Sequence, residues 1–257
     1  MKHLPHKKSV GIMGSKAFEP NIIMIENREN GMYKGAIFDL DGTLLDSMGV
    51  WERIDYEFLG KRGFEVPEDY VDTITAMSFE ETAIYTIERF QLPETKEAIM
   101  QEWIQMAIDA YSNDVVTKPG VQEYLKYLKE RGIQMCVATA SGLELVVPAL
   151  KHNRIYEYFD NITTLKEVSR GKGYPDIYEL AAKKMGLLPE ECVVFEDIPA
   201  GIKGAGSGGF ATVGVYDKRS GKDQDTIKEL ANAYILDFTN CEFPPAFLTA
   251  DEKETGK

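Results

Sequence analysis

The sequence predicts an α/β fold: a doubly wound, Rossmann-like parallel sheet with an all-helical domain inserted into it. Three observations indicate this. A short apolar run at residues 35–38 has the composition of a buried parallel strand. Residues 49–115 then show the three- and four-residue spacing of amphipathic helices, and from residue 119 onward short apolar runs alternate with helical patterns.

The first predicted strand, residues 35–38, runs directly into two acidic residues. Successive strand side chains point to opposite faces, so Asp39 and Asp41 point the same way. Like charges this close are unfavourable unless a cation holds them, as Mg²⁺ with oxygen ligands would. Gly42 supplies a sharp turn and Thr43 a hydroxyl beside it. The alternative is a solvated turn or a calcium loop, but either would sit in a polar segment.

Helical periodicity defines the inserted segment. Ser78 and Glu81 form the capping-box pattern of a helix start. We expect a helical cap domain of residues 49–115 between two parts of one core domain, residues 32–48 and 116–257. The apolar residues recur on one face of each helical run: Trp51, Ile54, Phe58 and Leu59; Phe79, Ala83, Ile84, Ile87 and Phe90; Ile99, Trp103, Ile104, Ala107 and Tyr111.

The second part of the core alternates between helices and strands. A helix follows Gly142, and we expect Pro148 in its first turn, because a proline in a helix interior removes a hydrogen bond. Ligands bind such sheets beyond the carboxyl ends of the strands, so polar residues should follow each strand. The expected strands are residues 133–138, 159–163, 192–195, 212–215 and 234–236.

Polar residues do follow the strand at residues 133–138. Thr139, Ala140 and Ser141 supply hydroxyls and backbone amides at the start of a helix. The free N–H groups and the dipole of a helix start favour a bound phosphate group. The alternative is that Thr139 and Ser141 only cap the helix.

Two further polar groups stand in comparable positions. Lys172 lies in a turn-rich loop before the helix at Pro175, where its ammonium group would neutralise phosphoryl oxygens. A solvated surface lysine is the alternative. Glu196 and Asp197 end the strand of residues 192–195 and suit the completion of an octahedral Mg²⁺ shell, with an exposed acidic turn as the alternative.

These segments resemble the motifs of a known superfamily. The run at residues 39–46, Asp-Leu-Asp-Gly-Thr-Leu-Leu-Asp, closely resembles the first motif of the haloacid dehalogenase superfamily. Residues 139–141, 172–178 and 195–205 resemble its second, third and fourth motifs, in the same order. The resemblance therefore extends over most of the chain.

The resemblance implies a chemistry for the individual residues. Asp39 would be the nucleophile that becomes an aspartyl-phosphate, and Asp41 the general acid/base. We expect the phosphate group to be bound by Gly42, Thr43, Thr139, Ala140, Ser141 and Lys172. The cofactor would be Mg²⁺, with the ligands Asp39, Asp41 through its backbone carbonyl, Asp197 and, through water, Glu196.

The third motif departs from the usual pattern. Gly173 stands where the superfamily commonly has proline, which loosens the loop. Lys166 or Arg170 is therefore an alternative to Lys172.

The helical insertion resembles the cap of the branch that contains β-phosphoglucomutase and phosphoglycolate phosphatase.

The leading hypothesis is a Mg²⁺-dependent phosphatase that hydrolyses a small phosphomonoester such as a sugar phosphate. A phosphosugar mutase is the first alternative, but Trp51 and Phe79 stand where mutases of this branch have a histidine and an arginine. The alternative role of Trp51 and Phe79 is to pack in the core of the cap, on the faces of its helices. A catalytically idle binding protein is the second alternative, and the presence of Asp39 and Asp41 argues against it. Asp41 also argues against dehalogenase and phosphonatase chemistry.

Composition restricts the other classes of function. The chain has 257 residues, a net charge of −13 and a pI near 4.8, which argues against the basic surface that nucleic acids require. It lacks the run of about eighteen apolar residues that predicts a membrane span. The expected partner is a small phosphorylated metabolite, and we expect a monomer or a weak homodimer.

The remaining signals concern the compartment and the N-terminal segment. Three widely spaced cysteines favour free thiols in a reducing cytoplasm. The histidines are scattered, so we expect no histidine catalysis. Residues 1–31 form an expected N-terminal extension, either disordered or non-native, since Met32 directly precedes the first strand. This extension lacks the apolar region of a secretory signal.

Overall fold

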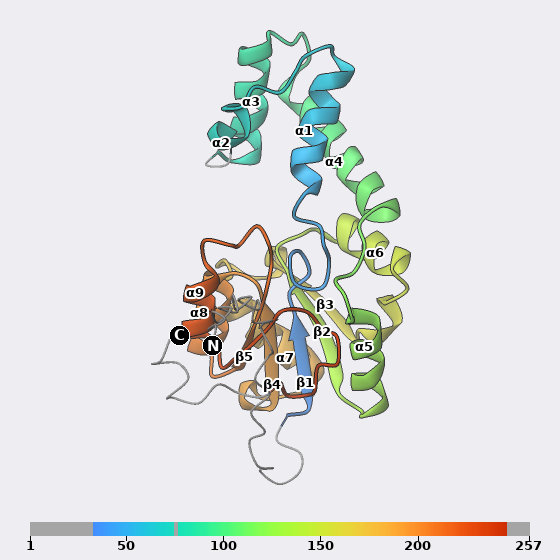
Figure 1. Cartoon of the computed structure of the whole chain (residues 1–257), viewed down its shortest axis with the longest axis vertical. Coiled ribbons are helices and arrows are strands. Elements are labelled where there is room, and N and C mark those ends of the chain that lie inside the picture. Colours follow the sequence, from blue (N-terminus) through green and yellow to red (C-terminus); the bar gives the residue numbers. More distant parts are fainter. Residues whose placement is uncertain (1–32, 75–76, 246–257) are drawn as a thin grey trace, which may run out of the picture.

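The computed structural model describes residues 33–74 and 77–245 of the chain (Figure 1). In this part, six parallel strands form one sheet in the order β3-β2-β1-β4-β5-β6. This is the strand order of a doubly wound fold with β1 near the centre, and it confirms the predicted class. The strands are β1, Gly35–Phe38; β2, Gln134–Thr139; β3, Asn161–Thr164; β4, Cys192–Glu196; β5, Ala211–Val215; and β6, Ala233–Ile235.

Alternate residues of β1 pack against helices on opposite faces of the sheet. Ala36 and Phe38 belong to a large buried cluster with α5 and α6, whereas Ile37 belongs to a second cluster with α7 and α8. All three side chains are fully buried, so the site has to lie at an end of the sheet. The core helices are α5, Val121–Glu130; α6, Leu143–His152; α7, Asp176–Met185; α8, Pro199–Ser207; and α9, Gln224–Leu230.

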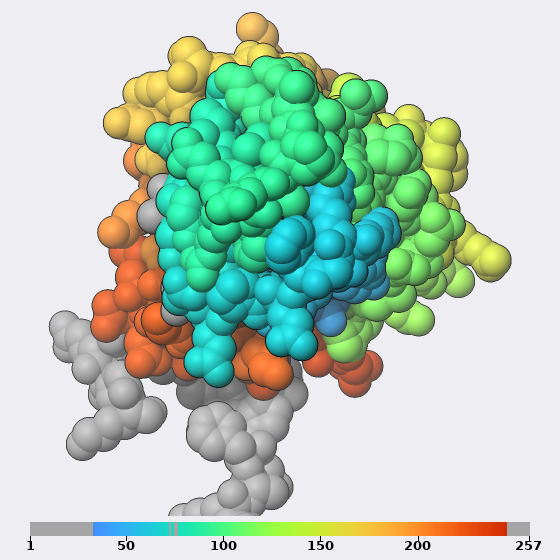
Figure 2. All heavy atoms as spheres, turned by 90° about the horizontal axis from the view of Figure 1, so that it is seen from above, coloured from blue at the N-terminus to red at the C-terminus, as the bar shows by residue number. Residues whose placement is uncertain are grey.

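The inserted helices α1–α4, which we call the cap, stand beyond the carboxyl end of β1 (Figure 1). Viewed from that side, they lie over the middle of the core (Figure 2). The lower part of α4 packs against α6 of the core. The predicted capping box is present, because Ser78 Oγ accepts from the Glu81 N–H and the Glu81 carboxylate accepts from the Ser78 N–H. The cap helices are α1, Val50–Lys61; α2, Tyr70–Ile74; α3, Phe79–Phe90; and α4, Lys96–Asn113.

The position of Pro148 corrects one expectation. α6 already begins at Leu143, because the Gly142 carbonyl accepts from the N–H groups of Leu145 and Val146. Pro148 is therefore in the interior of the helix and not in its first turn. An interior proline costs about 3 kcal/mol in an isolated helix. Burial of the apolar face of α6 outweighs this cost.

One helix was not expected, and three other expectations have different outcomes. The short helix α9 was not predicted. Residues 1–31 lie outside the described residues, and the division into extension, core and cap domains remains a prediction. No helix in residues 33–74 and 77–245 combines the length and the apolar character that crossing a membrane requires.

Candidate active site

Asp39 and Glu196 are neighbours because of the register between β1 and β4. The residues that precede them, Phe38 and Phe195, are paired in that register. The Asp39 N–H donates to the Phe195 carbonyl at 3.0 Å. Asp39 and Glu196 continue the strand alternation that faces α7, so the two carboxylates are brought together on that side of the sheet.

Lys172 bridges these two carboxylates. It precedes α7, and its Nζ contacts Asp39 Oδ1 and donates to Glu196 Oε1 at 2.6 Å. The hydroxyl of Tyr178 in α7 donates to the same Glu196 oxygen at 2.8 Å. Burial alone would lower the pKa of Lys172, but Asp39 and Glu196 raise it above its usual value. Lys172 is therefore a permanent cation in a buried site.

The alternatives to Lys172 lie elsewhere. Arg170 pairs with Asp176 at 2.7 Å, and Lys166 pairs with Glu144 at 3.4 Å on the surface. Although Gly173 replaces the usual proline, the loop still brings Lys172 to Asp39. α8 approaches this loop at Gly204, where a side chain would overlap the Lys172 carbonyl. The geometry thus favours Lys172 over the two alternatives.

Three buried carboxylates could hold a metal ion. One oxygen from each of Asp39, Glu196 and Asp197 lies within 4.8 Å of the others. With all three carboxylates ionised, the cluster and Lys172 would together carry two net negative charges, which a divalent cation would neutralise. Glu196 Oε2 is buried and has no hydrogen-bond partner. An oxygen-only donor set with an orphaned buried oxygen fits Mg²⁺.

Burial also perturbs the acids of this cluster. It raises the pKa of Asp39 well above the usual value, and Lys172 opposes this effect. Burial and the charge of Glu196 raise the pKa of Asp197 to about 6. Raised carboxylate pKa values in one buried cluster are typical of functional sites.

Asp197 lies beside the turn that follows β1. The Thr43 hydroxyl donates to Asp197 Oδ1 at 3.3 Å, and the Ser220 hydroxyl donates to Oδ2 at 3.4 Å. Gly42 has a positive φ of 82°, and a Cβ there would overlap the Asp197 carboxylate. Gly42 and Thr43 therefore contact a potential metal ligand, in addition to the phosphate-binding role predicted for them. Ser220 was not identified from the sequence.

Asp41 occupies a separate position. Its carboxylate is not part of the three-carboxylate cluster. Oδ1 accepts from the hydroxyls of Ser47 and Tyr111, and Oδ2 accepts from the Ser141 hydroxyl, each at 2.6 Å. The predicted backbone ligation of a metal by Asp41 remains a prediction. Tyr111 was not predicted as a site residue, because its spacing in the sequence is that of the apolar stripe of α4.

The segment after β2 lies beside Asp41. Thr139 is buried, and its Oγ1 accepts from the Ser141 N–H at 3.0 Å. Ala140 is exposed. The Ser141 hydroxyl joins this loop to Asp41 at the N-terminal end of α6. The loop has the polar groups that phosphate binding requires, and that role remains a prediction.

Trp51 and Phe79 contact each other in the cap. Their ring centroids are 5.8 Å apart, and Phe79 also contacts Trp103 at 5.6 Å. The two side chains are 41% and 36% exposed, respectively. They are thus partly packed in the cap and partly available to a ligand, which keeps both predicted roles open.

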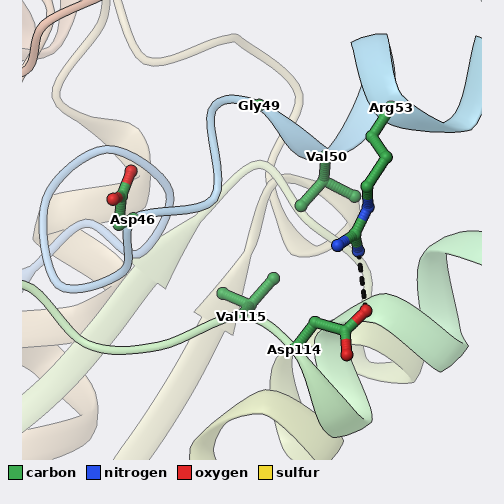
Figure 3. A pocket seen from close by; sticks show the side chains of 6 residues that line it. All are labelled: Asp46, Gly49, Val50, Arg53, Asp114 and Val115. Carbon is green, nitrogen blue, oxygen red and sulfur yellow. Dashed lines mark hydrogen bonds and ion pairs between the residues drawn. The ribbon is translucent and has the colours of Figure 1, made fainter.

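A hollow of about 300 Å³, which none of the three clustered carboxylates lines, lies where the chain passes between core and cap (Figure 3). Arg53 of α1 and Asp114 at the end of α4 form an ion pair of 2.9 Å beside it. The hollow is therefore a feature of the connection between core and cap. Its lining residues are Asp46, Gly49, Val50, Arg53, Asp114 and Val115.

Comparison with known proteins places this site in a family. The model of the haloacid dehalogenase-like hydrolase family matches residues 36–215, and the chain belongs to this family. The match includes every residue predicted for the site.

Two relatives of the chain in Escherichia coli are named as phosphatases. The chain is 31% identical to hexitol phosphatase A of Escherichia coli K12, over 66% of this chain and 76% of that protein. It is 30% identical to the fructose-1-phosphate phosphatase of the same organism, over 71% and 96%. The crystal structure of β-phosphoglucomutase from Clostridium difficile shares the fold, with a TM-score of 0.61, 24% identity and coverage of 82% and 94%.

Proposed function

We propose that this phosphoric monoester hydrolase is a Mg²⁺-dependent phosphatase that acts on a small phosphorylated sugar through an aspartyl-phosphate. One observation carries the proposal: Asp39, Glu196 and Asp197 form a buried cluster with Lys172. The curated relatives with hexitol and fructose-1-phosphate phosphatase activity support the sugar class.

The chemistry follows from the positions of the side chains. Asp39 attacks phosphorus, and the bond to the leaving oxygen breaks. Asp41 gives its proton to that oxygen and later takes one from the water that hydrolyses the aspartyl-phosphate. Lys172 and the amides at residues 139–141 hold the phosphoryl charge. A bound Mg²⁺ would neutralise charge on the nucleophile and the phosphoryl group.

Hydrolysis is favoured over phosphoryl return to a sugar. A mutase has to grip a second phosphate group while the first is transferred. Trp51 and Phe79 offer aromatic surface and no charge at the two positions where we expect that grip. An idle binding protein would have no use for a buried lysine held between two carboxylates. The cytoplasmic location and the monomeric or weakly dimeric state remain predictions.

A two-stage assay tests the proposal. Turnover of an aryl phosphate should require Mg²⁺, disappear with EDTA and return when Mg²⁺ is added in excess. A panel of sugar phosphates, including β-glucose 1-phosphate, then identifies the class. Release of free phosphate supports a phosphatase, whereas formation of glucose 6-phosphate indicates a mutase. Absence of turnover with every substrate would leave the binding-protein alternative.

A further inference from the structure

Three hydroxyl groups from three separate segments converge on Asp41. Ser47 lies between β1 and the cap, Tyr111 lies in the last turns of α4, and Ser141 follows β2. Each hydroxyl is 2.6 Å from a carboxylate oxygen. A carboxylate has about four acceptor positions. The three donors leave one position, on Oδ2, for a proton that could be transferred.

Tyr111 is the only one of these donors that belongs to a cap helix. Its side chain is 2% exposed, so its ring cannot turn away from Asp41 without movement of α4. The end of α4 is itself fixed to the core. Asn153, which directly follows α6, donates to the Val115 carbonyl at 2.8 Å and accepts from the Thr117 N–H at 3.0 Å. The Tyr111 hydroxyl is thus held in place from both sides.

We propose that Tyr111 is a positioning residue for proton transfer by Asp41, an inference that rests on the proposed phosphatase function. The Tyr111 hydroxyl holds Oδ1 and thereby fixes the orientation of the carboxyl group. As the bond between phosphorus and the leaving oxygen breaks, the proton on Asp41 passes to that oxygen. Asp41 becomes a carboxylate, and it takes a proton from water in the second half of the reaction.

This role makes the effect of Tyr111 depend on the leaving group. An alkoxide from a sugar is a strong base and needs the proton from Asp41, whereas a nitrophenolate leaves without one. Misplacement of the acid by about 1 Å can reduce a rate by about 10²-fold. Loss of the Tyr111 hydroxyl should therefore slow the hydrolysis of alkyl phosphates and spare that of activated aryl phosphates. A general defect in the cap would slow both.

The test compares Tyr111→Phe with Tyr70→Phe. Both changes remove one buried hydroxyl from the cap, but the Tyr70 hydroxyl bonds the Thr86 hydroxyl at 2.7 Å instead of Asp41. We expect kcat of Tyr111→Phe to fall about 10- to 100-fold with an alkyl phosphate and less than about threefold with p-nitrophenyl phosphate. Tyr70→Phe should change the two rates by the same factor. Melting temperatures report whether both variants fold.

Two results would overturn the inference. One is an equal change of both rates in a folded Tyr111→Phe protein, and the other is a faster reaction with the alkyl phosphate. Ser47→Ala provides a second arm, because it removes the other donor to Oδ1 and should also slow alkyl phosphate hydrolysis while sparing the aryl phosphate. Failure of the proposed function is distinct, since the unaltered protein would then hydrolyse neither substrate with Mg²⁺.

Discussion

Gly42 and Asp197 approach each other so closely that no side chain fits between them. A Cβ at residue 42 would overlap Oδ2 of Asp197, and the φ of Gly42 is +82°. The turn after β1 therefore contacts the carboxylate that follows β4 directly. A substitution at Gly42 should therefore displace the Asp197 carboxylate, and the same substitution at a distant glycine with a similar φ can serve as a control.

Gly42→Ala should weaken metal binding by displacing Asp197. Gly63→Ala is the control, because Gly63 has a φ of +80° and open space around the missing Cβ. Each change carries a backbone cost of about 1 kcal/mol. Only Gly42→Ala should raise the Mg²⁺ concentration for half-maximal activity, by about tenfold. Equal Mg²⁺ dependence of the two variants would show that Gly42 does not support Asp197.

Lys172→Met should destabilise the fold most when no metal is present. Removal of the ammonium group leaves the buried Asp39 and Glu196 carboxylates in mutual repulsion, at a cost of about 3 kcal/mol. Added Mg²⁺ should restore part of this stability by supplying positive charge. Urea unfolding with EDTA and with Mg²⁺ measures the difference. Lys166→Met is the control, because Lys166 is exposed, and it should change the free energy of unfolding by less than about 0.5 kcal/mol. An identical loss of stability for Lys172→Met with EDTA and with Mg²⁺ would contradict the proposed metal site.

Asp55→Asn should stabilise the protein at high pH. Burial, followed by the charge of Glu52, raises the pKa of Asp55 to about 7. The folded state then holds a proton that the unfolded state has already lost, so stability falls as pH rises from about 4 to 7. The variant removes this loss, which we place at about 1–2 kcal/mol because Asp55 is only half-buried. Below about pH 4, the free energy of unfolding of the two proteins should depend on pH in the same way. Parallel curves of unfolding free energy against pH from about pH 4 to 8 would refute the proposed role of Asp55.

The ends of the parallel strands account for the parts of the site that the sequence could predict. Asp39, Glu196 and Asp197 follow apolar runs, and parallel strands bring such positions to one edge of the sheet. Lys172 could be located by its loop and its motif. For the three carboxylates a local pattern and a simple rule of topology were sufficient, whereas Lys172 depended on the resemblance to the motif and left Lys166 and Arg170 as alternatives.

Tyr111, Ser220 and Tyr178 could not be found in this way. The spacing around Tyr111 is that of a helix face, and nothing local shows that its hydroxyl reaches Asp41, 70 residues away in sequence. Ser220 meets Asp197 through a loop after β5 with no regular pattern. Such contacts depend on tertiary packing. The interior position of Pro148 has the same origin, because packing outweighed a local preference.

The central claim is that Asp39 accepts the phosphoryl group. Rapid acid quenching during turnover with Mg²⁺, followed by mass analysis of peptides, should find one phosphoryl group on Asp39. Asp39→Asn should show neither the adduct nor turnover while unfolding at a similar urea concentration. Full turnover by Asp39→Asn, or a phosphoryl group trapped on another residue, would contradict the account.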